Sequence, residues 1–164
     1  MQQTIHIRPV EAGDYAAWRP LWDGYNAFYG RVDATALPEG ITTATWDRFL
    51  NAEEPVHALV ALSQGQIVGL AHFLFHRSTT RIDDVCYLQD LFTVEHLRGQ
   101  GIGRQLILAV YAAARQAGST RVYWQTHSSN DKGRALYDKV GEHKGFIVYV
   151  NDIPPAHQAG HSTR

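Results

Sequence analysis

The sequence predicts a mixed α/β (α+β) fold in a single domain, and two patterns support this assignment. Apolar runs at 57–61 and 67–75 flank a Ser-Gln-Gly-Gln turn at 63–66, which is typical of an antiparallel β-hairpin. Further along, strand-like runs alternate with helical periodicities. A chain of 164 residues suits one core, so we expect one domain over 1–153 and a flexible C-terminal tail over 154–164.

Apolar periodicity and turn residues predict six strands and four helices. The strands are expected at 5–8, 57–61, 67–75, 85–94, 121–126 and 146–150. A first helix begins after Asp14 and runs to Phe28, with a distortion at Pro20. The other helices are expected at 45–50, at 106–117 before a terminating glycine, and from a cap at Ser129 or Asn130 to residue 140.

The composition excludes several classes of protein. The formal net charge is -1 with acids and bases interspersed, so we expect no nucleic-acid partner. The single cysteine, Cys86, lies in an apolar run, which favours a buried thiol in a reducing cytoplasm. No run approaches the roughly 20 apolar residues of a membrane span, and the first residues lack a signal pattern, so we expect neither membrane contact nor export.

A glycine-rich segment at 97–104 lies between a strand and an amphipathic helix. Free N–H groups in the first turn of a helix can bind a phosphate, and glycines let it approach the main chain. Arg98 and Arg104 add positive charge. The segment lacks the Gly-Lys-Ser/Thr of a P-loop and the Gly-x-Gly-x-x-Gly spacing of a dinucleotide fold. It therefore predicts an anion site, and a connector without a ligand is the alternative.

The string Arg-Gly-Gln-Gly-Ile-Gly at 98–103 resembles the acetyl-CoA pyrophosphate loop of the GNAT superfamily of N-acetyltransferases. The segment 87–94 is similar to the fourth strand of that family, and 130–137 is similar to its asparagine-to-tyrosine helix. Within the superfamily, Tyr-Leu-Gln-Asp at 87–90 resembles the polyamine and diamine branch. The resemblance implies a GNAT-like mixed, mostly antiparallel sheet of six to seven strands, flanked by about four helices and splayed between strands 4 and 5.

The resemblance also implies which residues bind acetyl-CoA as co-substrate. The main chain of the fourth strand would pair with the pantetheine arm, and the glycine loop would bind the pyrophosphate. Asn130 matches a pantetheine-binding residue and also suits a helix cap. The expected cofactor-binding residues are Leu91, Phe92, Thr93, Arg98, Gly99, Gln100, Gly101, Ile102, Gly103, Arg104, Asn130, Gly133 and Tyr137. No metal is expected, since no histidine pair has a ligand spacing.

Two catalytic residues are expected. Tyr137 matches the family's general acid, and a phenol suits protonation of a leaving thiolate. Gln89 stands where polyamine relatives often carry a glutamate, and an amide cannot accept the proton of an ammonium group. Asp90 is the base that we favour, although in a regular strand it would face away from Gln89. His72 and His127 are the alternatives.

The acceptor is expected to be a primary amine of a small molecule, either a diamine or polyamine or an amino acid. The expected substrate-binding residues are Tyr25, Tyr29, Trp46 and Gln89. Glu39 or Asp33, in the loop between the first two helices, would add an acidic group, because an aromatic wall with acidic groups suits a cationic amine. A protein lysine or N-terminal amine is an alternative acceptor, and a CoA-binding sensor without catalysis is an alternative function. By analogy with related enzymes, we expect a cytoplasmic homodimer.

Overall fold

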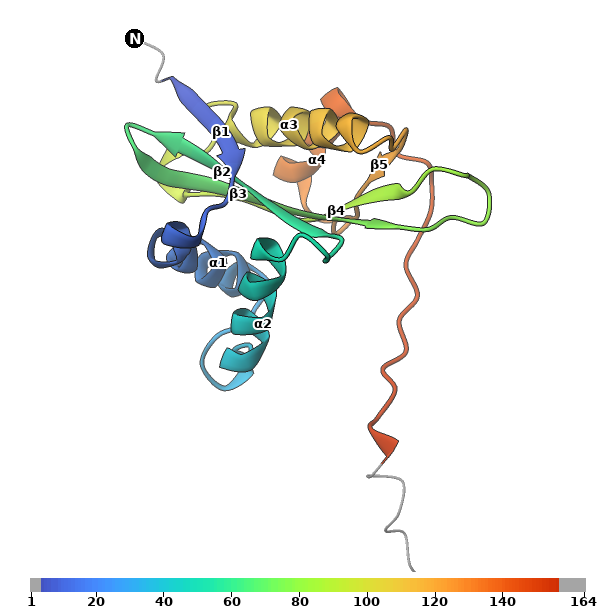
Figure 1. Cartoon of the computed structure of the whole chain (residues 1–164), viewed down its shortest axis with the longest axis horizontal. Helices are drawn as coiled ribbons and strands as arrows, with labels where there is room; N and C mark the ends of the chain where they lie inside the picture. Colours follow the sequence, from blue (N-terminus) through green and yellow to red (C-terminus); the bar gives the residue numbers. More distant parts are fainter. Residues whose placement is uncertain (1–3, 157–164) are drawn as a thin grey trace, which may run out of the picture.

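A computed structural model describes residues 4–156 and places a five-stranded sheet between two pairs of helices (Figure 1). The helices α1 and α2 cover one face of the sheet, and α3 and α4 cover the other (Figure 1). The elements are β1 (Ile5–Pro9), α1 (Tyr15–Phe28), α2 (Glu39–Leu50), β2 (Val56–Ser63), β3 (Gln66–His76), β4 (Val85–Thr93), α3 (Ile102–Gln116), β5 (Val122–Tyr123) and α4 (Asp131–Val140). The predicted mixed α/β class and the four helices are confirmed.

The sheet has the strand order β1-β2-β3-β4-β5. The first four strands are antiparallel, whereas β5 pairs parallel to β4. Gln64 and Gly65 join β2 to β3 with φ of 51° and 77°, which suits a tight hairpin turn with both central residues in the left-handed region. The hairpin expected from the sequence is therefore present.

Each face of the sheet has its own core. On the α3 face, Leu106, Ile107 and Val110 are fully buried against the strands. On the α1 face, Trp18, Trp22 and Trp46 form an aromatic cluster, with Trp18 fully buried. The helix α1 continues through Pro20, where a distortion was expected.

The expected count of six to seven strands is wrong for the described residues. The segment 146–150 was predicted as a last strand, but it is extended without a partner and leads away from the sheet (Figure 1). Its five side chains are 62–88% exposed. Apolar β-branched and aromatic residues favour an extended backbone, but a strand also needs a neighbouring edge, which local sequence does not specify. The fifth strand is likewise limited to Val122–Tyr123, whereas 121–126 was expected.

None of the helices in the described residues is long and apolar enough to cross a membrane. Cys86 is fully buried in β4, and desolvation raises the pKa of its thiol to about 12. This thiol therefore stays protonated at neutral pH. The predicted tail over 154–164 lies mostly outside the described residues.

Candidate functional site

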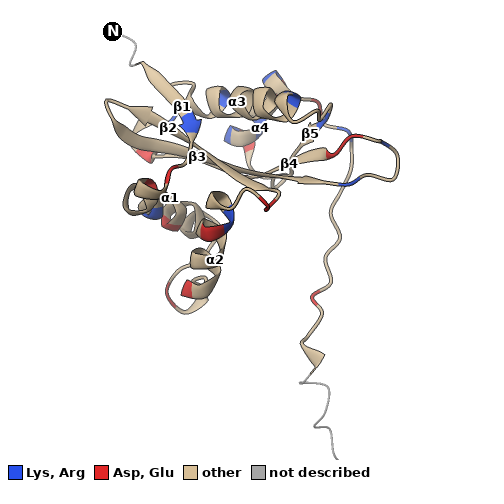
Figure 2. Cartoon of the chain, viewed as in Figure 1, with Lys and Arg blue, Asp and Glu red and all other residues tan. Residues whose placement is uncertain are grey.

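The glycine segment forms an exposed turn that leads into α3. Gly99 and Gly101 have φ of 77° and 83°, in the left-handed region that favours glycine. Gly101 is the residue before the helix, and no side chain among the described residues caps this end. The first-turn amides of α3 can therefore bind an anion. The helix carries Arg104 near this end and no acidic residue (Figure 2).

Two further contacts shape this turn. The Arg98 Nε donates a hydrogen bond to the Thr93 carbonyl oxygen at 3.0 Å, and the guanidinium lies over the Phe92 ring. A Cβ on Gly103 would lie 3.3 Å from the Leu136 side chain, so glycine lets α3 approach α4 closely. The Ile102 side chain is buried in the core, so this residue can offer a ligand its amide alone.

The outer edge of β4 loses its neighbouring strand before the glycine turn. The parallel ladder with β5 includes Cys86↔Val122 and Tyr87↔Tyr123, but β4 continues to Thr93. Within the described residues, no strand pairs with this edge at Leu91, Phe92 and Thr93. An extended ligand can therefore form main-chain hydrogen bonds there. The edge and the α3 terminus fit the pantetheine arm and the pyrophosphate of acetyl-CoA.

A β-bulge in β4 determines where Asp90 points. The register with β3 pairs His72 with Asp90 but Phe73 with Leu88, so Gln89 has no partner. The bulge shifts the alternation of faces by one residue. Leu88 and Leu91 both pack on the α3 core, whereas Asp90 faces the α1 side and is only 7% exposed. Gln89 itself is exposed.

Asp90 belongs to a buried hydrogen-bond network. The indole Nε1 of Trp18 donates to His72 Nε2 at 3.0 Å. Because an indole N–H can only donate, His72 carries its proton on Nδ1, which donates to Asp90 Oδ2 at 2.9 Å. Desolvation raises the pKa of Tyr25, and the adjacent Asp90 carboxylate raises it further. Both His72 nitrogens are occupied, so His72 has no free lone pair for an incoming proton.

A cavity of about 340 Å³ opens between the end of α1 and the start of α4. It is lined by Phe28, Tyr29, His127, Ser129 and Asn130. The Asn130 side chain is held from two sides, since its Oδ1 accepts from the Gly133 amide at 3.1 Å and its Nδ2 donates to Thr126 Oγ1 at 2.9 Å. Asn130 is thus the cap of α4, and the alternative cap, Ser129, is not used.

Tyr137 lies on α4 near this cavity. It is half-buried and packs edge-on against Trp124, with the ring centroids 5.6 Å apart. Desolvation raises the pKa of its phenol, and the nearby Tyr29 contributes to the rise. The Tyr137 hydroxyl has no hydrogen-bond partner among residues 4–156. It is nevertheless not fully buried, since Ser63 Oγ is the one fully buried side-chain polar atom without a partner in that range. The Tyr137 hydroxyl is therefore protonated, accessible and free to donate.

The remaining expected site residues are distributed between the cavity and the core. Tyr29 lines the cavity, whereas Tyr25 is buried beside it, with the two ring centroids 5.0 Å apart. Trp46 is buried among Tyr15, Trp18 and Phe49 and does not line the cavity. In the described part of the chain, no three His, Cys, Asp or Glu side chains gather in a way that could hold a metal ion.

Sequence reasoning did not identify several residues of the site. Phe28 and Ser129 line the cavity, and the Arg31 guanidinium lies over the rings of Tyr25 and Tyr29. Trp18, which orients His72, was expected only as core. No motif marks these positions. The available signal was closeness in sequence to expected site residues, since Phe28 and Arg31 lie beside Tyr29 and Ser129 precedes Asn130.

Comparisons with known proteins identify the family of this chain. The profile of the acetyltransferase (GNAT) family matches residues 18–141. The D-amino-acid N-acetyltransferase HPA3 of Saccharomyces cerevisiae is 32% identical over 151 residues, covering 91% of this chain and 91% of the relative. YhfO of Bacillus subtilis, an uncharacterized N-acetyltransferase, is 31% identical over 152 residues, covering 92% and 99%.

A solved structure shares the fold. The complex of AAC(6')-Iy with a bisubstrate analog superimposes with a TM-score of 0.77 at 19% identity, covering 92% of this chain and 99% of the other. The uncapped glycine turn, the free edge of β4 and the tyrosine of α4 thus occur in a chain that the family profile matches over most of its length. The chain belongs to the acetyltransferase (GNAT) family and is an acetyl-CoA-dependent N-acetyltransferase.

Proposed function

We propose that this enzyme transfers the acetyl group to a primary amine of a small molecule by direct attack in a ternary complex. The cavity beside Asn130 and Tyr29 carries this proposal, because its volume of about 340 Å³ suits a small molecule. The diamine, polyamine and amino-acid classes all fit this description. The activity in the name of the yeast relative supports an amino acid, whereas the polyamine branch is not confirmed by the comparisons.

Two side chains would move the protons of the reaction. Acetyl-CoA, when bound, supplies a thioester as the electrophile. Asp90 would accept the proton that the ammonium group must lose before attack, since Gln89 is an amide and His72 has no free nitrogen. Tyr137 would donate a proton to the departing sulfur, because burial keeps its phenol protonated. His127 lines the cavity and is the second candidate for the base.

The release of free CoA thiol tests the function. We expect amine-dependent release with at least one of a panel of diamines, polyamines, amino acids, aminoglycosides and a lysine peptide. Buried Cys86 does not contribute to the thiol signal of the folded protein. Release with the lysine peptide alone would favour a protein acceptor. Intact CoA binding without release from any amine would favour the CoA-binding sensor, and absence of CoA binding would contradict the assigned pyrophosphate turn.

We also propose that the enzyme is a cytoplasmic homodimer in which the segment 146–150 of one copy pairs with the open edge of β5 in the other. The segment exposes five successive apolar residues, and it leads away from its own sheet (Figure 1). A strand edge and an unpaired apolar strand are complementary. An N-acetyltransferase that acts in a ternary complex does not require this contact, so the dimer and the reaction can be tested separately.

Light scattering during size-exclusion chromatography checks the dimer. We expect a mass near twice 18.4 kDa for the wild type, and a mass near 18.4 kDa for Ile147→Lys/Tyr149→Lys, since the added charges disfavour strand pairing. Ile41→Lys is a matched control, because Ile41 is an exposed apolar residue of α2 and is distant in sequence from the segment 146–150. A monomeric wild type at micromolar concentration would rule out this assembly.

A further inference from the structure

Arg31 lies just after α1, and a buried residue, Asn26, binds both its main chain and its side chain. Its main-chain N–H donates to the Asn26 carbonyl oxygen at 2.9 Å, and its Nε donates to Asn26 Oδ1 at 2.6 Å. Asn26 is only 4% exposed, and its Nδ2 donates to the Trp22 carbonyl oxygen. The buried side-chain amide of Asn26 therefore fixes the position of the Arg31 Nε.

Two aromatic rings position the Arg31 guanidinium. Its Cζ lies 5.4 Å from the centroid of Tyr29, which lines the cavity, and 5.8 Å from the centroid of Tyr25. Cation–π contacts of this kind stabilise a guanidinium without neutralising its charge. Within residues 4–156, no carboxylate lies within 4.0 Å of this guanidinium, and its two Nη atoms make no hydrogen bond. The charge is fixed in place and has no counter-ion there.

Opposite charges lie on either side of Tyr25. Its phenol neighbours the Asp90 carboxylate, and the Arg31 guanidinium covers its ring. An α-amino acid carries a cation and an anion on one carbon atom, so it matches this pair of charges. A diamine or polyamine would instead bring a second ammonium group toward Arg31, which repels it.

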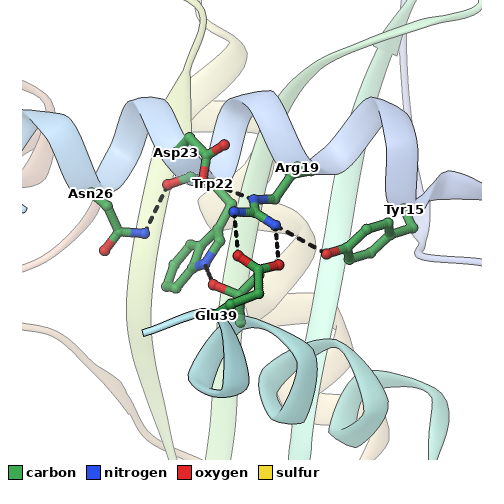
Figure 3. Close-up of polar contacts among 7 residues, drawn as sticks. Tyr15, Arg19, Trp22, Asp23, Asn26 and Glu39 are labelled. Atoms are coloured by element: carbon green, nitrogen blue, oxygen red, sulfur yellow. Dashed lines mark hydrogen bonds and ion pairs between the residues drawn. The ribbon is translucent and has the colours of Figure 1, made fainter. Parts of the chain in front are cut away.

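Glu39, an acidic residue at the start of α2, is already paired. Glu39 accepts from Arg19 Nη1 at 2.6 Å and from Nη2 at 2.9 Å (Figure 3). The same guanidinium also binds Asp23 through its Nε at 2.9 Å (Figure 3). Asp23 of α1 and Glu39 of α2 are therefore both neutralised by Arg19, and these two carboxylates do not offer a polyamine a free anion.

We propose that Arg31 binds the carboxylate of the acceptor, and that the acceptor class is the α-amino acids. This inference rests on the proposed transfer of acetyl to a small-molecule amine. The planar fork of the two Nη atoms can donate two parallel hydrogen bonds to one carboxylate. The amino nitrogen of the same molecule is then directed toward the Asp90 side of Tyr25.

Pairs of acceptors that differ by one carboxylate test the inference. The pairs are phenylalanine with phenethylamine, methionine with 3-(methylthio)propylamine, and lysine with cadaverine, with both enantiomers of each amino acid. In the wild type, we expect kcat/KM to be higher for the amino acid of each productive pair. In Arg31→Gln, we expect kcat/KM for the amino acid to fall about 10- to 100-fold, mainly through KM, as for a lost charge-assisted contact.

Two comparisons make this result specific. For phenethylamine and 3-(methylthio)propylamine, kcat/KM should change less than about threefold between wild type and Arg31→Gln, because these amines have no group for Arg31 to bind. For cadaverine, kcat/KM should not fall, because the variant no longer repels its second ammonium group. For each acceptor, the kcat/KM of the variant is divided by the kcat/KM of the wild type. This ratio cancels the difference in amine pKa between acceptors. Arg31→Lys should recover part of the loss, and Arg115→Gln should change neither acceptor, since Arg115 is exposed on α3.

The outcomes separate the inference from the function. Equal loss for the amino acid and its amine, or a wild type that prefers the amine, overturns the role of Arg31 and leaves the acetyl transfer intact. If no amine is acetylated, the proposed function fails, and calorimetric titration of the same pairs in the presence of CoA still decides the inference. Amino acids that bind no tighter than their amines would overturn it.

Discussion

Tyr137→Phe is expected to lower kcat about 10²- to 10³-fold, with little change in KM for acetyl-CoA. The hydroxyl is accessible, and it has no hydrogen-bond partner among the described residues, so its removal breaks no contact that the fold provides there. Because burial raises the pKa of this phenol, its acid form persists above the ordinary tyrosine value of about 10. Tyr137 should therefore impose no alkaline limit on kcat below that pH.

Tyr111→Phe is the matched control for the loss of a hydroxyl. Tyr111 packs against the same core from α3, and its hydroxyl donates to the Val140 carbonyl oxygen at 2.7 Å. Its removal should lower the free energy of unfolding by about 1 kcal/mol and leave kcat within a factor of three. If Tyr137→Phe behaves like Tyr111→Phe in both measurements, the thiolate leaves without help from Tyr137.

Asp90→Asn is expected to lower kcat/KM for the amine about 10²- to 10³-fold near neutral pH. The asparagine carbonyl oxygen can still accept from His72 Nδ1, so the network and the fold should survive, with a loss in unfolding free energy of about 1 kcal/mol. The difference in rate between Asp90→Asn and the wild type should become smaller as the pH rises toward the pKa of the acceptor amine, because more of the amine in solution is then already neutral. Initial rates between pH 6 and pH 10, roughly the range of amine ionisation, measure this convergence.

Asp84→Asn makes the same chemical change outside the site. Asp84 pairs with Arg77 before the start of β4, and the Arg77 side chain is 89% exposed. Its replacement should leave the pH profile of the wild type unchanged. A loss in Asp90→Asn that is constant across pH would indicate that Asp90 maintains the structure, and His127 would then be the remaining candidate for the base.

The sequence predicted the elements of this fold better than the directions of its side chains. Periodicity located the helices, and the glycine spacing located the turn before α3, because both signals are local. The direction of the Asp90 side chain depends on a bulge at Gln89, and no residue type at this position predicts a bulge. Alternation along a regular strand assigns Asp90 and Leu88 to the same face, whereas the structure places them on opposite faces.

Two other differences have tertiary causes. Trp46 has the aromatic character of a substrate-binding residue, but α2 directs it into the cluster around Trp18. The last expected strand has the right residues at 146–150 but no neighbouring edge in its own chain. Arg31 became informative only when the contacts with Asn26, Tyr25 and Tyr29 were known.

Both cores end before the exposed segment begins. Within residues 4–156, the buried residues that form the two clusters extend no further than Ala114, and the last side chain packed against them is Val140. During synthesis the chain up to Val140 leaves the ribosome first, and it contains every residue that these cores require. The two cores can therefore form without residues 146–150, and the burial of this segment is a separate event.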